Sequence, residues 1–128
     1  MDQLTLLCPC CSNKAFKHCC APYLSGTANA KTVKQLMRSR YCAFALGGYA
    51  DYLIHTWHPS TAPDISDLSE TGPEWVMLDV VGSEQNGNSG TVEFKAVYID
   101  EEGHEAVHHE VSEFVRVKGK WYYVGQQL

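Results

Sequence analysis

The sequence predicts an α+β fold in which two helices pack on one face of a four-stranded antiparallel sheet, preceded by a small metal-binding head. Three observations lead to this fold class. Five of the six cysteines lie in the first 20 residues, apolar residues recur at helical spacing over residues 33–57, and the apolar period changes to two after residue 74. With 128 residues, 45% hydrophobic and 20% charged, the chain has the size and composition of one small domain with a short appendage.

The cysteines near the start are spaced as ligands of a single metal ion. Cys8 and Cys10 form one close pair, Cys19 and Cys20 form another, and one loop of the chain can bring the pairs together. The absence of a secretory signal favours the reducing cytoplasm and a metal site, and adjacent cysteines are strained disulfide partners. Four thiolates suit Zn²⁺ and leave no position for water. We therefore predict a structural zinc ion bound by Cys8, Cys10, Cys19 and Cys20.

Two neighbours of these ligands remain ambiguous. Cys11 or His18 can replace an adjacent ligand, and free thiols without metal are a further alternative. Cys42 stands alone in the sequence and receives no role.

Two helices are expected after the Ser25-Gly26 linker. Thr32 and Gln35 form a capping box that begins the first helix, which should end at Gly47-Gly48. Arg40 falls near the middle of the apolar face of this helix, whose other members are Val33, Leu36, Met37, Tyr41 and Phe44. A shorter helix should run from Tyr49 to about Trp57 and end before Pro59.

The rest of the chain has the alternation of a four-stranded antiparallel meander. Turns are expected at residues 86–90, at 100–103 and at Lys118-Gly119. The predicted strands are Trp75 to Val81, Thr91 to Ile99, Ala106 to Val117 and Trp121 to Val124.

Two stretches resemble known families. The run Cys-Pro-Cys-Cys-Ser-Asn-Lys-Ala-Phe-Lys-His-Cys-Cys at 8–20 resembles the zinc-binding SEC-C motif, which usually has glycine where this chain has Cys11. Leu-Met-Arg-Ser-Arg-Tyr at 36–41, Asp-Tyr-Leu-Ile-His-Thr-Trp-His-Pro at 51–59 and Gly-Lys-Trp-Tyr-Tyr-Val at 119–124 resemble the YchJ family, in which a SEC-C segment precedes a nuclear transport factor 2-like domain.

The resemblance implies a fold and a domain division, but no activity. It implies a cone in which a curved sheet wraps around helices and leaves a pocket. We expect the SEC-C-like segment at residues 1–25 and the nuclear transport factor 2-like domain at 26–128. The YchJ family tends to have two arginines in His-Glu-Arg-Ser-Arg-Phe, where this chain has Val111 and Glu113, so any role of those arginines is absent here.

Charged residues are expected inside this pocket. Alternation in the third strand places Glu110 on the face of Phe114, and a buried carboxylate needs a partner. Arg40 is the most plausible partner, and Asp79 can compete for it. Two interpretations of these charged residues remain open. They form a structural ion pair, or they belong to an enzyme of the isomerase or dehydratase kind, with Glu110 as general base and His55, His58 or Tyr41 as acid. The expected pocket residues are Arg40, Tyr41, Glu110, Phe114 and His58.

The charge distribution bears on the partners. The first 48 residues contain six of the ten basic residues but only one of the fifteen acidic residues. The basic residues are too few, and too little interleaved with aromatic residues, to favour nucleic acid over a protein partner. We expect a cytoplasmic binding or adaptor protein that docks on protein through its zinc head, has no membrane insertion, can hold a small molecule in the cone and can form a homodimer through the open sheet face.

Overall fold

A single antiparallel sheet with helices on one face makes up the computed structural model, which describes residues 6–68 and 73–127. The strand order is β1-β2-β3-β4, as expected for a meander. The strands are β1 (Glu74–Asn86), β2 (Ser89–Ile99), β3 (Glu105–Val117) and β4 (Lys120–Gln126). The helical segments are η2 (Phe16–His18), α1 (Ala21–Leu24), α2 (Val33–Leu46), α3 (Ala50–His55) and η3 (Ile65–Leu68).

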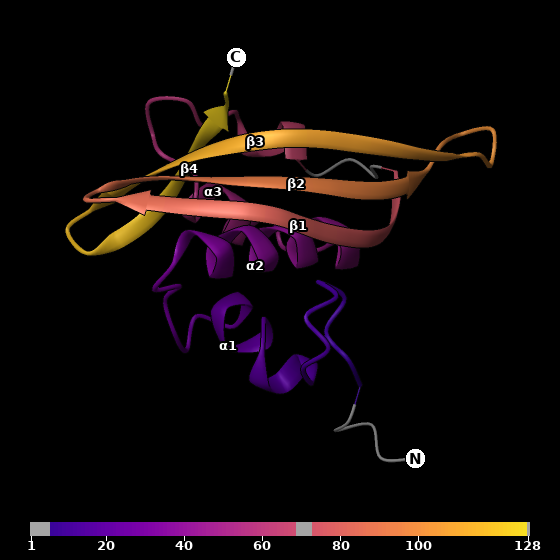
Figure 1. Ribbon diagram of the computed structural model, residues 1–128, viewed down its shortest axis with the longest axis horizontal. Helices are drawn as coiled ribbons and strands as arrows, with labels where there is room; N and C mark the ends of the chain where they lie inside the picture. The colour runs from indigo at the N-terminus through magenta and orange to yellow at the C-terminus, as the bar shows by residue number, and fades with distance from the viewer. Residues whose placement is uncertain (1–5, 69–72, 128) are drawn as a thin grey trace.

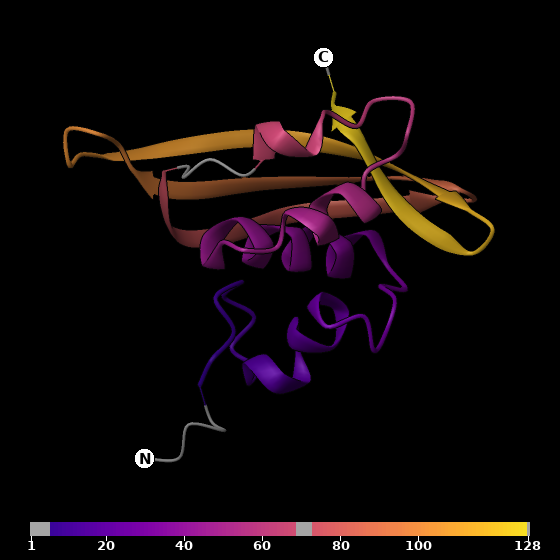
Figure 2. The same cartoon turned by 180° about the vertical axis from the view of Figure 1, so that it is seen from behind.

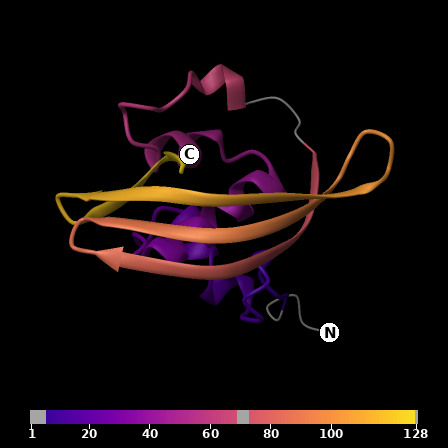
Figure 3. The ribbon, with the colours of Figure 1, turned by 45° about the horizontal axis from the view of Figure 1, so that its top comes forward.

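Helix α2 lies between the sheet and the N-terminal head. Figures 1 and 2 show the sheet on one side of this helix and the head with α1 on the other. Figure 3 shows the strands in front of α2 and the head, so both lie on the same side of the sheet. The predicted α+β architecture is therefore confirmed. Within the described residues, no helix is long and apolar enough to cross a lipid bilayer.

The ends of α2 are those that the sequence predicts. Thr32 Oγ1 accepts a hydrogen bond from Gln35 N at 3.1 Å, and Gln35 Oε1 accepts one from Lys31 N at 2.7 Å. These two bonds satisfy amides that have no partner within the helix. The helix ends at Leu46 and is capped by Gly47, whose φ of 74° lies in the region that favours glycine.

The apolar face of α2 is largely buried. Val33, Leu36, Met37 and Tyr41 are in the core, and Arg40 is buried among them as predicted. Phe44 is 45% exposed, because the last turn of the helix borders a cavity rather than closely packed side chains.

Some element boundaries differ from the prediction. Strand β1 continues five residues past Val81 to Asn86, where its hairpin with β2 turns. Helix α3 ends at His55, because the next residues bind β4 instead. Tyr123 N donates to Thr56 O and His58 N donates to Tyr123 O, each at 2.8 Å, and Trp57 forms a parallel bridge with Tyr123.

The head and the sheet share one hydrophobic core. Three cysteines of the head, Cys8, Cys10 and Cys20, belong to the same buried cluster as the side chains of α2 and the inner face of the sheet. The head is therefore packed against the body, with α2 as the common surface.

Gly90 in β2 allows the first turn of α2 to approach the sheet. A Cβ atom at this position would lie 2.7 Å from Val33 Cγ1 and 3.0 Å from the carbonyl oxygen of Glu84. Val33 N also donates to Gln85 Oε1 at 2.9 Å, so the helix start is held on the β1–β2 hairpin. A side chain at position 90 would push this contact apart.

We predict that Gly90→Ala destabilises the fold by about 1 to 3 kcal/mol, because overpacking a buried contact has this cost. Gly82→Ala is the matched control, since an added Cβ there has no atom within 4 Å. It should change stability by less than about 0.5 kcal/mol. Denaturant unfolding of both variants measures the difference. Equal stability of the two would contradict the close approach of α2 to β2.

Candidate metal centre and cavity

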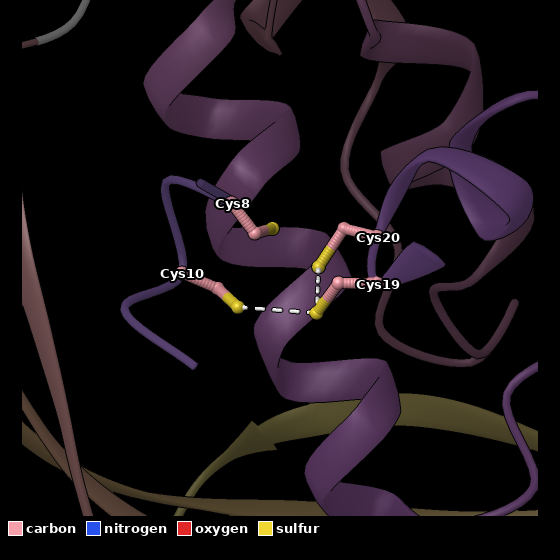
Figure 4. Close-up of side chains that lie close together, drawn as sticks. All are labelled: Cys8, Cys10, Cys19 and Cys20. Carbon is pink, nitrogen blue, oxygen red and sulfur yellow. Dashed lines mark hydrogen bonds between the residues drawn. The ribbon is translucent and has the colours of Figure 1, made fainter. Parts of the chain in front are cut away.

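Four cysteines come together between the head and α2. The Sγ atoms of Cys8, Cys10, Cys19 and Cys20 all lie within 4.8 Å of one another. Figure 4 shows these four side chains gathered beside the helix. The Cys10 and Cys19 sulfur atoms are 3.6 Å apart, and those of Cys19 and Cys20 are 3.9 Å apart. The structure therefore brings together the four ligands that the sequence predicts.

These separations fit a tetrahedral metal ion. Four sulfur atoms at about 2.3 Å from a common centre lie about 3.8 Å from one another in a tetrahedron. The cluster thus has the donor type and the spacing that Zn²⁺ and other thiophilic ions require. Four protein ligands would close the coordination shell.

The loop that carries the first cysteine pair is fixed by backbone hydrogen bonds. Cys8 N donates to Lys14 O and Phe16 N donates to Leu6 O, each at 2.8 Å. Arg38 on α2 donates from Nη1 to the carbonyl oxygen of Cys10 at 2.6 Å. No local sequence pattern predicts this role of Arg38, because it depends on the backbone of a loop 28 residues away.

Cys42 is a fifth sulfur at the cluster. It is fully buried on α2, and its Sγ lies 3.5 Å from that of Cys8. In this position its thiol can donate to a metal-bound Cys8 thiolate, which would orient and stabilise that ligand. The sequence did not predict this position, because Cys42 is 34 residues from Cys8 along the chain and only the packing of α2 on the head brings them together.

Cys11 and His18 lie away from the cluster. Cys11 Sγ accepts from Leu78 N in β1 at 3.5 Å, and His18 is exposed. Cys11 has a φ of 65°, in the left-handed region where a side chain costs about 1 to 2 kcal/mol. This conformation explains why glycine suits the position in SEC-C motifs.

The thiols of the cluster share protons when no metal is bound. Side-chain hydrogen bonds from Cys20, Cys42 and Cys8 lower the pKa of Cys10. The same bond to Cys10 raises the pKa of Cys20, which keeps its proton to donate. Metal binding must displace these protons, so the affinity should fall as the pH falls.

A second feature is a cavity of about 400 Å³ between α2 and the inner face of the sheet. Of the five pocket residues expected from the sequence, Arg40, Tyr41 and Glu110 line it. Phe114 is buried beyond it, and His58 lies outside the lining, with its ring beside Tyr122 and its Nδ1 bonded to Ser60. The other walls are mainly aromatic and apolar.

Arg40 and Glu110 do not form the expected ion pair. Among the described residues, no carboxylate oxygen lies within 4.0 Å of the Arg40 guanidinium. Instead, Arg40 Nη1 donates to Leu53 O at 2.8 Å and to Thr56 Oγ1 at 2.7 Å. The pair fails because Leu53 in α3, and Thr56 directly after it, supply oxygen acceptors at hydrogen-bond distance.

Aromatic rings complete the surroundings of Arg40. Its Cζ lies 4.7 Å from the ring centre of Trp57 and 4.6 Å from that of Tyr123. Burial lowers the pKa of Arg40 to about 10, which still leaves it charged at neutral pH. The rings stabilise the cation by cation–π interactions.

Glu110 is the centre of a separate polar network. Its Oε1 accepts from His108 Nε2 at 2.9 Å, and its Oε2 accepts from Ser112 Oγ at 2.5 Å and from Tyr123 Oη at 2.9 Å. Burial, followed by the charge of Glu110, raises the pKa of Tyr123, so its hydroxyl remains a donor. Tyr123 thereby connects the two charged residues, with its ring on Arg40 and its hydroxyl on Glu110.

The remaining candidates lie elsewhere. Asp79 is exposed and pairs in register with Lys95, and His55 is exposed at the end of α3. Trp57 and Tyr123 also line the cavity, although the sequence did not lead us to expect them there. The alternation of Trp121 and Tyr123 could have placed Tyr123 on the inner face, but nothing local predicts the bridge that positions Trp57.

A larger cavity of about 560 Å³ lies between α1, α3 and β4. Its lining combines loop residues 25, 26 and 28–30 with exposed residues such as Asp51, His55 and Lys120. It has no buried charged residue, so the cavity at Arg40 is the stronger candidate for specific binding.

Two family models match the chain. The model described as "YchJ, middle NTF2-like domain" matches residues 32–126, and the SEC-C motif matches residues 5–22. A UPF0225 protein of Streptomyces coelicolor is 41% identical over 119 residues, which cover 91% of this chain and 90% of the relative. A UPF0225 protein of Photorhabdus laumondii is 39% identical, with 94% and 80% covered.

Two solved structures are similar to this one. The solution structure of a SEC-C motif containing protein from Rhodopseudomonas palustris has a TM-score of 0.87 and 36% identity, covering 94% of this chain and 96% of that chain. The crystal structure of such a protein from Psychrobacter arcticus has a TM-score of 0.80 and 29% identity, with 96% and 83% covered.

We predict that Cys10→Ser abolishes tight binding of one metal ion per chain, whereas Cys11→Gly retains it. Cys10 lies in the cluster, but Cys11 is directed at β1 and occupies a conformation that glycine adopts without strain. Elemental analysis of both purified variants measures the metal content. Loss of metal from Cys11→Gly, with retention in Cys10→Ser, would reassign the ligands.

Proposed function

This chain belongs to the YchJ (UPF0225) family, and we propose from this premise that it is a binding protein with a structural zinc head and a small-molecule site in its nuclear transport factor 2-like cavity. One observation carries the proposal. The buried Arg40 and Ser112 and the half-buried Glu110 and Tyr123, from α2, β3 and β4, converge on an apolar cavity of about 400 Å³. Small-molecule sites typically combine this volume with a few placed polar groups.

We infer that the metal of the head is zinc. The support is a set of four thiolates at tetrahedral spacing, which is the usual donor set of structural zinc sites. Such a site leaves no position at which a water molecule could be activated. We propose that the zinc ion holds the head on α2.

The hydrogen bonds of Glu110 favour a binding function over a catalytic one. In an isomerase or dehydratase, this carboxylate would accept a proton from the substrate. Here both of its oxygen atoms already accept hydrogen bonds, from three donors. Proton abstraction would first require one of these bonds to break, so we treat the enzyme as the alternative.

The head is also our candidate for an adaptor function. Leu6 and Leu7 are 64% and 62% exposed, and the exposed Lys14 follows in the same loop. An acidic protein segment with apolar side chains would complement this surface. We extend the proposal to a cytoplasmic location, because all six cysteines are free, and to a homodimer through the exposed Met77 and Val107 on the outer sheet face.

We predict that native mass spectrometry of freshly purified protein detects a retained small molecule, or that added indole shifts NMR signals of residues around the cavity. Ala96→Phe should abolish either signal, because Ala96 is buried in the cavity wall and the larger ring would fill the space.

The control is Ala28→Phe, which alters the lining of the larger cavity. It should leave the signal unchanged. Shifts that gather around Tyr23 and Tyr52 instead would place binding in the larger cavity. The absence of both a retained molecule and any shift would contradict a small-molecule site.

A further inference from the structure

Arg40 is a buried cation whose charge has no carboxylate partner in the described part of the chain. The residue is 3% exposed, and its two hydrogen bonds to the described residues both come from Nη1. Both acceptors, a carbonyl and a hydroxyl, are neutral. A buried charge normally requires an opposite charge as well as hydrogen bonds, so this site is electrostatically incomplete.

The unused donors of Arg40 belong to a residue that lines the cavity. A guanidinium has five N–H groups, and those of Nε and Nη2 have no acceptor among the described residues. Trp57 lines the same cavity, and its Nε1 is also buried without a hydrogen-bond partner. Arg40 and its neighbour Trp57 therefore both have N–H donors without acceptors in the described part of the chain.

Glu110 does not supply the missing charge. Its oxygen atoms are occupied by His108, Ser112 and Tyr123, and the ring of Tyr123 covers one face of Arg40. The carboxylate is close enough to favour the charged form of Arg40, but its effect is smaller than that of burial. Room for a second acceptor remains on the cavity side.

The walls define the rest of the ligand. Tyr41, Trp75 and Tyr98 form a chain of aromatic contacts, with ring centres 6.3 Å and 5.2 Å apart. These rings line the cavity together with Phe44 and Phe94. A flat apolar group would bury its surface against them.

We propose that the cavity binds an organic monocarboxylate with a flat apolar body, whose carboxylate pairs with Arg40. This inference rests on the proposed small-molecule site and names the class of its ligand. The planar guanidinium fork matches a carboxylate with two parallel hydrogen bonds. A doubly charged phosphate fits less well, because a single arginine opposes it and Glu110 repels it.

The test compares two probes with the same naphthalene body, 2-naphthoate, which is an anion with two acceptor oxygens, and 2-naphthamide, which is neutral and has one. Calorimetry or NMR titration of the full chain should give a dissociation constant at least about tenfold lower for the carboxylate, as expected for charge-assisted hydrogen bonds. The carboxylate should also shift the Arg40 Nε–H signal, and the amide should not. Inorganic phosphate should not compete with 2-naphthoate.

The matched variants are Arg40→Lys and Arg116→Lys. The first keeps the charge but loses the fork, so it should reduce the preference for the carboxylate several-fold. The second alters a partly exposed arginine outside this cavity and should have no effect. If Arg40→Lys does not fold, the two probes and the Arg40 signal in the unmodified chain still decide the question.

The outcomes separate the two proposals. Equal affinity for both probes would overturn the carboxylate inference and leave the small-molecule site in place. A preference for the carboxylate that Arg40→Lys does not change would also overturn the carboxylate inference. Effective competition by phosphate would overturn the inference that the ligand has an apolar body. Failure of both probes and of indole to shift any cavity signal would contradict the site itself.

Discussion

Helix α2 is buried on two sides, and its position determines both the sulfur cluster and the cavity. One side of the helix carries Cys42 and Arg38, which contact the sulfur cluster and the loop of the head. Another side carries Arg40 and Tyr41, which line the cavity under the sheet. Because α2 is a single rigid helix, a change in its position at the cluster would also displace the cavity wall.

The two sides of α2 have different chemistry. Thiols that share protons, and that can bind a soft metal ion, gather on the side of the head. On the side of the cavity, Arg40 is held by neutral oxygen atoms and aromatic rings. These contacts offset part of the cost of removing its charge from water, but they do not replace a counter-charge. Because of this difference in chemistry, the cavity side of α2 suits an anion, whereas the thiols on the side of the head suit a metal cation.

Much of this arrangement could be predicted from the sequence, because local patterns determine it. The capping box and the glycine pair gave the ends of α2, helical spacing placed Arg40 inside, and cysteine spacing identified the four clustered thiols. The prediction that Arg40 forms an ion pair with Glu110 was wrong. Burial of two charges does not fix their geometry, and the acceptors that Arg40 uses come from backbone and side-chain oxygens of the α3 region, which carry no charge signal.

The contacts that escaped prediction are those between distant segments. The position of Cys42 beside Cys8, the bond from Arg38 to Cys10, and the bridge from Trp57 to Tyr123 all depend on how separate elements pack. The left-handed backbone of Cys11 escaped prediction for another reason. The resemblance to SEC-C motifs showed that glycine is usual at this position, but it did not show which backbone conformation glycine serves there.

If the metal-bound head holds α2 in place over the cavity, removal of the metal should loosen this helix. Backbone hydrogen exchange with and without a chelator measures the effect, because exchange reports the opening of each amide. We expect metal removal to lower protection throughout α2 as well as in residues 6–24. Loss of protection confined to residues 6–24, with α2 as protected as before, would contradict it.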